Sequence, residues 1–80
     1  MPSSMDQVKA VLNAEQDWIM SQLAAQASHT EGRSVYTGYD RNGIPTIFVL
    51  APTISLDVKE KIRQRVHVPV EFVEINIELL

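Results

Sequence analysis

The sequence predicts an α+β fold, a two-layer sandwich with two helices packed on one face of a three-stranded mixed sheet of order 1-2-3. Two segments repeat apolar residues at a helical spacing, and three short segments are rich in β-branched and aromatic residues. An Asn-Gly turn separates the first two of these three segments. The order helix-strand-strand-helix-strand then fits a single domain over residues 1–80.

The first helix is expected over residues 5–27, after a loose end at residues 1–4. Ser4 and Gln7 have the Ser-x-x-Gln spacing of a capping box, in which each side chain accepts a hydrogen bond from the other residue's backbone N–H. Trp18 lies beside the apolar arc of this helix, and this position is more typical of a core edge than of a partner anchor. The arc itself is formed by Met5, Val8, Leu12, Ile19 and Leu23.

The turn that follows the first strand has two interpretations. A type I′ turn at Asn42-Gly43 would pair Arg41 with Ile44. A type I turn that starts at Asp40 and is closed by a left-handed Gly43 would instead pair Asp40 with Ile44. We favour the second interpretation, because Asp at the first position and Gly at the fourth are the residues that this turn prefers.

The turn also sets the register of the hairpin, which is expected over residues 33–51. The two registers differ by one residue and therefore assign opposite faces across the hairpin. The second strand is apolar on both faces over residues 47–50, so we expect it to be central in the sheet. In the favoured register the opposed pairs are Val35 with Val49, Tyr36 with Phe48, and Thr37 with Ile47.

The second helix is expected over residues 55–67, with Ser55 as its N-cap. Pro69 forbids continuation of the helix and favours extended backbone before it. The third strand, over residues 70–79, should then run parallel to the second strand through a right-handed crossover. The buried stripe of this helix is predicted from apolar residues at every fourth position: Ile54, Val58, Ile62 and Val66.

With both helices on one face, large apolar side chains remain on the other face of the sheet. Such a patch needs a partner, and we expect a homodimer through the open face or through a free strand edge. Two alternatives remain: the first helix crosses to that face, or the hairpin has the other register. The residues of the expected patch are Tyr36, Phe48, Leu50 and Phe72.

Basic residues concentrate in the second helix, which holds four of the seven Lys and Arg residues of the chain. One interpretation is a surface for an acidic partner, or a weak nucleic-acid-binding module over residues 59–67. The simpler interpretation is a solvated helix face whose charges complement the helix dipole. The net charge of −3 argues against nucleic acid as a partner. The basic residues are Lys59, Lys61, Arg63 and Arg65.

No constellation of catalytic residues stands out in the chain. His29 and His67 are far apart, there is no cysteine, and no serine lies in a G-x-S-x-G motif. We therefore expect no enzymatic activity, no metal and no cofactor. The longest apolar run is too short to span a membrane, and the first residues lack the pattern of a leader. The lack of cysteine favours the reducing cytoplasm. The function expected from the sequence is that of a small protein-interaction module that associates with itself.

The segments GYDRNGIPTIFVLA and VPVEFVEI resemble a small module found ahead of some bacterial trypsin-like proteases, in which an NGxP turn and a final VPVEVVE strand recur. The likeness covers about half of the chain, and no protease residues are present in it. RNA-binding KH modules share part of this element order, but their Gly-x-x-Gly loop is absent. The resemblance therefore implies no activity for this chain.

Overall fold

The structure is a computed structural model, and it describes residues 4–26 and 32–75. Its elements follow the predicted order, with a three-stranded sheet in the order β1-β2-β3. Strands β1 and β2 are antiparallel, whereas β2 and β3 are parallel. The fold predicted from the sequence is therefore confirmed. The elements are α1 (Met5–Gln26), β1 (Ser34–Tyr39), β2 (Pro45–Ala51), α2 (Leu56–Arg65) and β3 (Val70–Glu74).

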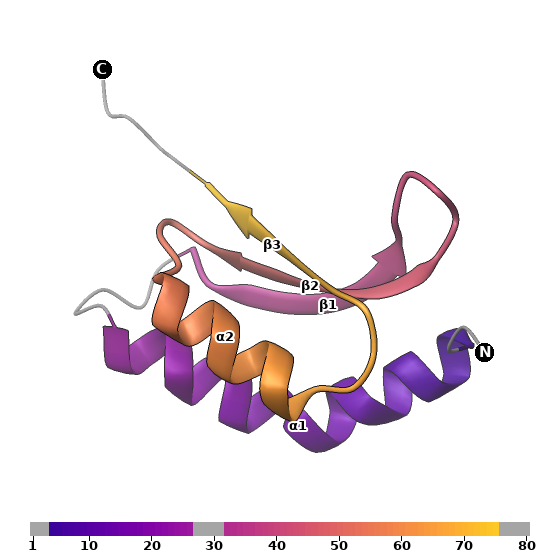
Figure 1. Ribbon diagram of the computed structural model, residues 1–80, viewed down its shortest axis with the longest axis horizontal. Helices are drawn as coiled ribbons and strands as arrows, with labels where there is room; N and C mark the ends of the chain where they lie inside the picture. Colours follow the sequence, from indigo (N-terminus) through magenta and orange to yellow (C-terminus); the bar gives the residue numbers. More distant parts are fainter. Residues whose placement is uncertain (1–3, 27–31, 76–80) are drawn as a thin grey trace.

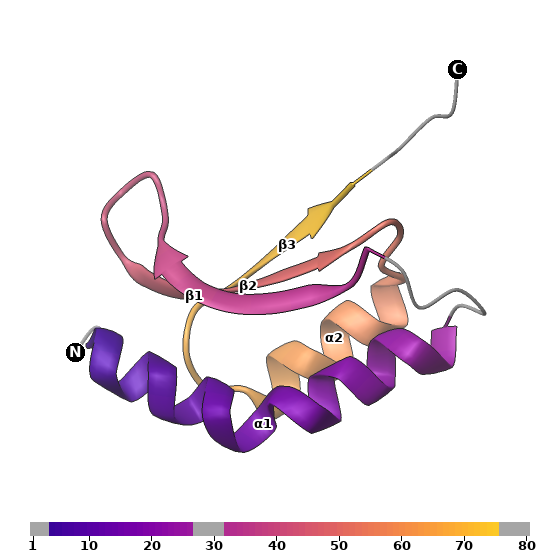
Figure 2. The ribbon, with the colours of Figure 1, turned by 180° about the vertical axis from the view of Figure 1, so that it is seen from behind.

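The two helices form one layer and the sheet forms the other (Figure 1). Both helices lie against the same face of the sheet, and α2 runs alongside the later half of the longer α1 (Figures 1 and 2). The first helix therefore does not cross to the other face, which was one alternative for the apolar patch. Among the described residues, no other element covers the second face of the sheet.

The core lies between these two layers. Helix α2 contributes its expected stripe and α1 contributes three residues of its expected arc, with Leu12 packed against the cluster and Met5 outside it, and β2 contributes alternate residues, as a central strand does. Val8, Ile19 and Leu23 of α1 are fully buried. The remaining residues of the buried apolar cluster are Ile47, Val49, Ala51, Ile54, Val58, Ile62 and Val66.

Both helices begin at the predicted caps. The backbone N–H of Ser4 donates to Gln7 Oε1 at 2.9 Å, and the N–H of Gln7 donates to Ser4 Oγ at 3.2 Å. At α2, Ser55 Oγ accepts from the N–H of Val58 at 3.2 Å. These contacts satisfy N–H groups in the first turn, which have no partner within the helix itself.

Helix α2 is shorter than expected, because it ends at Arg65 and not at residue 67. Its C-cap, Val66, already has extended backbone with φ −100° and ψ 114°. The chain needs this extended stretch to deliver the residues around Pro69 to the sheet, where the Pro69 carbonyl accepts from the N–H of Ile47 at 2.9 Å.

The hairpin has the favoured type of turn. Gly43 has φ 76°, and its N–H donates to the Asp40 carbonyl at 2.9 Å. The N–H of Asp40 donates to the Ile44 carbonyl at 3.1 Å, which closes the bulge after the turn. The Asp40 carboxylate also accepts from the N–H groups of Asn42 and Ile44, at 2.8 and 3.0 Å. The predicted register, with Tyr36 opposite Phe48, is confirmed.

Strand β3 ends at Glu74, and the N–H of Ile75 still donates to the Ala51 carbonyl at 2.9 Å. The part of the predicted strand over residues 76–79 lies outside the described residues. The same holds for His29, for the last residue of the predicted first helix, and for residues 1–3 of the predicted loose end.

Candidate interaction surface

The face of the sheet opposite the helices is called the open face here. Strand pairing and the alternation of side chains place Tyr36, Phe48, Leu50 and Val73 on it, and these four residues are called the open-face patch. None of the four belongs to the buried cluster or packs against it. Tyr36 is 44% exposed, and the other three are half-buried. The four side chains therefore lie outside the core and are only partly covered.

Two aromatic rings of the patch lie against each other. Tyr36 and Phe48 are cross-strand partners, and their ring centroids are 5.3 Å apart with an angle of 15° between the planes. Gly38 gives the Phe48 ring room, since a Cβ at Gly38 would lie 3.1 Å from Phe48 Cε2. The two rings are therefore stacked on each other and form one continuous apolar part of the open face.

Phe72 was expected on the open face, and this part of the expected patch is wrong. Phe72 pairs with Val49, whose side chain is buried beneath the helices, and it packs against the buried cluster. The guanidinium carbon of Arg63 lies 5.1 Å from the centre of the Phe72 ring. The parallel register with β2 decides this placement, and it brings Val73 to the open face beside Leu50 instead.

The four basic residues of α2 all interact within the chain. Lys59 forms an ion pair with Glu74 of β3 at 2.9 Å, and Lys61 forms one with Asp57 at 3.1 Å. Arg63 lies over the Phe72 ring. Three of the four cations predicted to form a surface for an acidic partner are therefore engaged within the chain.

Arg65, the fourth cation, joins the two helices. Its Nε lies 2.5 Å from Oε2 of Glu15, and its guanidinium carbon lies 4.4 Å from the centre of the Trp18 ring. Glu15 interrupts the apolar arc of α1, and this contact explains why an acidic residue occurs there. Trp18 packs against the buried cluster, so its interpretation as a core-edge residue is confirmed.

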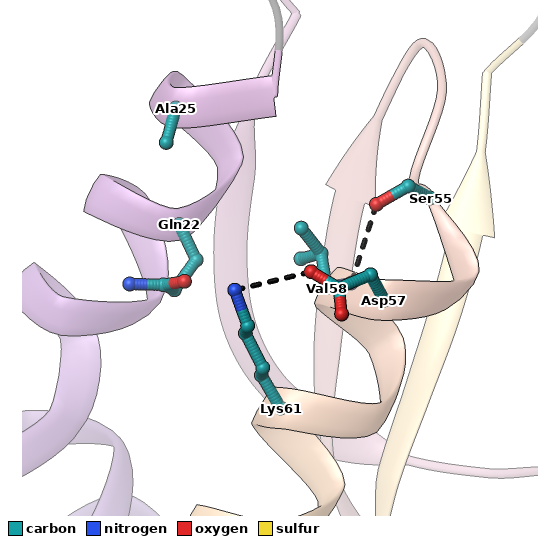
Figure 3. Close-up of a pocket in the computed structure, with 6 residues that line it drawn as sticks. All are labelled: Gln22, Ala25, Ser55, Asp57, Val58 and Lys61. Atoms are coloured by element: carbon teal, nitrogen blue, oxygen red, sulfur yellow. Dashed lines mark hydrogen bonds and ion pairs between the residues drawn. The ribbon is translucent and has the colours of Figure 1, made fainter.

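A shallow depression of about 170 Å³ lies between the C-terminal end of α1 and the N-terminal end of α2 (Figure 3). The Lys61–Asp57 ion pair crosses its rim (Figure 3). Sites for small molecules commonly enclose about 300–1,000 Å³, so this depression is smaller than such a site. Its lining residues are Gln22, Ala25, Ser55, Asp57, Val58 and Lys61.

Residues 4–26 and 32–75 contain neither a metal-binding cluster nor a membrane-spanning helix. No group of three or more His, Cys, Asp or Glu residues in these ranges is placed to hold a metal ion. No helix within them is long and apolar enough to cross a membrane.

The open face carries little charge. Among its described positions, Glu71 of β3 is the one ionisable acid, and it lies beside Phe48 at the edge of the sheet. No described Lys, Arg or His lies on a strand position of this face. The face therefore offers an apolar centre with one carboxylate at its rim.

Comparison of the chain with protein-family models, with curated proteins and with solved structures gives no match. The function is therefore inferred from the geometry of this chain.

Proposed function

We propose that this protein is a small interaction module that associates with itself through the open-face patch. The observation that carries the proposal is that Tyr36, Phe48, Leu50 and Val73 lie together outside the core. Contiguous apolar side chains on a soluble protein mark contact surfaces, because their exposure to water is unfavourable. The role is non-enzymatic, and the lack of cysteine fits the reducing cytoplasm as its compartment.

The occupant of the open face is a second copy of the chain. An acidic partner would find no complementary charge there, because no described Lys, Arg or His lies on a strand position of this face, and a strongly basic partner would find Glu71 as the one carboxylate among the described strand positions. An identical open face, in contrast, supplies an apolar centre of the same size and chemistry. Two such faces in contact form an isologous interface, in which the same patch is used by both subunits.

The size of the open face predicts a weak dimer. Three strands spaced about 4.8 Å apart and about 20 Å long cover roughly 300 Å² per copy. Two copies would therefore bury about 600 Å², whereas stable interfaces bury at least about 1,200 Å². We therefore expect a reversible dimer whose population rises with protein concentration.

The proposal is tested by measuring molar mass in a concentration series with light scattering and sedimentation equilibrium. The wild-type mass should rise from that of a monomer towards twice that value as the concentration increases. Val73→Lys should hold the chain as a monomer, since it places a charge within the apolar patch that the two copies bury. Val73 lies on an edge strand, where a lysine side chain can reach solvent in the free monomer.

Leu56→Lys is the matched control, because Leu56 is an apolar residue that is 68% exposed at the start of α2. It should dimerise like the wild type. A wild-type mass that stays monomeric up to millimolar concentration would reject the proposal. If Val73→Lys and Leu56→Lys reduced the dimer equally, the open face would not be the interface.

The alternative function, nucleic-acid binding by α2, gains no support from the structure. Each of its four basic residues has a partner within the chain, so binding a phosphate would compete with these contacts. The net charge of −3 also opposes the approach of a polyanion.

A further inference from the structure

A polar group flanks the aromatic centre of the open face on each side. Strand pairing sets Tyr36 opposite Phe48 and Phe48 opposite Glu71, so the three residues form one row across the sheet. Tyr36 and Glu71 lie on the two outer strands, two strand spacings apart, or about 10 Å. They are therefore too far apart to meet within one subunit.

Neither polar group has an intramolecular partner within residues 4–26 and 32–75. Among the described residues, no hydrogen bond involves the Tyr36 hydroxyl, and no hydrogen bond or ion pair involves the Glu71 carboxylate. A face-to-face dimer would take both groups out of water. A buried hydroxyl without a partner costs about 1–3 kcal/mol, and a buried carboxylate costs more.

We propose that two copies of the chain, associating as proposed above, stack around a two-fold axis parallel to β2, so that Tyr36 donates a hydrogen bond to Glu71 of the partner subunit. Rotation about this axis exchanges the two outer strands and leaves each residue at the same level along the strands. Tyr36 of each subunit then faces Glu71 of the partner subunit, because both belong to the Phe48 row. The interface therefore contains two identical Tyr-to-Glu contacts on either side of the central phenylalanines.

Other two-fold axes leave these groups without partners. An axis across the strands at the level of Phe48 sets Glu71 against the partner's Glu71, and like charges at that place repel each other. An axis across the strands between the rows of Phe48 and Leu50 sets Glu71 against the partner's Val73. The axis along β2 is the arrangement of these three that pairs the hydroxyl with the carboxylate.

The proposed dimer has four layers, with the helices outermost and the two sheets packed in the middle. The hairpin loop rises on the open side of the sheet at one end (Figure 1). Under the proposed axis the β2 strands run in the same direction, so the hairpins of both subunits lie at the same end of the dimer. They flank the axis there and limit how far the sheets can slide along each other.

The test uses single-cysteine variants, since the chain has no cysteine of its own. Tyr36→Cys and Glu71→Cys are prepared separately, mixed in equal amounts at a concentration where the wild type is dimeric, and treated with a short bismaleimide. Positions 36 and 71 of opposite subunits should lie about 10 Å apart, the spacing of packed sheets. Two copies of position 36 should lie about 14 Å apart, because they are separated by two strand spacings within the plane of the sheets and, at right angles to that, by the distance between the sheets.

Cross-linked dimers should therefore form mainly between the two variants in the mixture and much less within either variant alone. A mixture of Leu56→Cys and Glu71→Cys is the control for random collision. The second readout is a double-mutant cycle: Tyr36→Phe should weaken the dimer about fivefold, and Tyr36→Phe combined with Glu71→Gln should weaken it by much less than the product of the single effects.

Efficient cross-linking of Tyr36→Cys with itself, with additive effects in the cycle, would overturn the axis along β2. In that case a wild type that still dimerises, and a Val73→Lys variant that does not, would leave the proposed function standing. A wild type that is monomeric at every concentration would overturn the function and the axis together.

Discussion

The guanidinium of Arg65 lies over the Trp18 ring, with its carbon 4.4 Å from the centre of the ring. The same guanidinium bonds to Glu15, so one side chain of α2 connects to two residues of α1. This contact supplements an apolar interface between the helices and fixes how they lie side by side.

Arg65→Ala should lower the free energy of unfolding by about 0.5–2 kcal/mol. The expected loss combines a cation–π contact of about 0.5–1 kcal/mol with a partly exposed ion pair of about 0–1 kcal/mol. Urea denaturation followed by circular dichroism measures it. In a cycle with Glu15→Gln, the two effects should not add, because both variants remove the same bond. Arg41→Ala at the exposed hairpin is the control and should leave the unfolding midpoint unchanged.

Gly43→Ala should destabilise the chain by about 1 kcal/mol. Gly43 has φ 76°, a conformation that a residue with Cβ adopts at a cost. No atom lies within 4 Å of the position a Cβ would take, so the effect should come from backbone strain alone. Gly43→Asn should cost less than Gly43→Ala, since Asn tolerates the left-handed region better. Equal urea midpoints for these two variants would contradict this explanation.

Ile62→Ala should destabilise the chain far more than Leu56→Ala, although both residues are aliphatic and belong to α2. Ile62 is fully buried, and its truncation leaves a cavity at a typical cost of 2–5 kcal/mol. Leu56 is 68% exposed, so its truncation should cost less than about 0.5 kcal/mol. Thermal unfolding of both variants measures the difference. Similar losses in the two variants would mean that α2 packs by another face.

The wild type should pass through a phosphocellulose column at about 0.15 M salt without retention. The cations of α2 are engaged by Glu15, Asp57, Glu74 and Phe72, and the net charge is −3. Elution that shifts with salt, and that is lost in Lys61→Glu combined with Arg65→Glu, would restore nucleic-acid binding as the function.

Local chemistry made much of the fold predictable. The caps at Ser4 and Ser55 and the turn from Asp40 to Gly43 depend on residues within four positions of each other, so their geometry can be read from the sequence. This turn also fixes the register of the hairpin, and the register places Tyr36 and Phe48 on one face of the sheet.

Phe72 was misplaced because its face depends on a non-local pairing. The parallel register of β3 against β2 is set by the length of α2 and by how the chain returns through Pro69. No turn motif in the sequence indicates that register. The adjacent apolar residues Phe72 and Val73 lie on opposite faces of β3, so the apolar pattern does not show which face is buried either. The partners of Lys59 and Arg65 are likewise distant in sequence, so periodicity indicates a charged helix face without showing what it binds.

The ion pairs of α2 bear on the order in which the structure opens. Lys59 holds the end of β3 and Arg65 holds the middle of α1, so this short helix links an edge strand to the long helix. When α2 loosens, β3 loses the helix that packs on it and can separate from β2. The edge of β2 that pairs with β3 is then exposed. Amide hydrogens of α2 and β3 should therefore exchange with solvent as one cooperative unit, ahead of those between β1 and β2. The same event uncovers the β3-facing edge of an apolar strand, and such an edge can recruit strands from other chains.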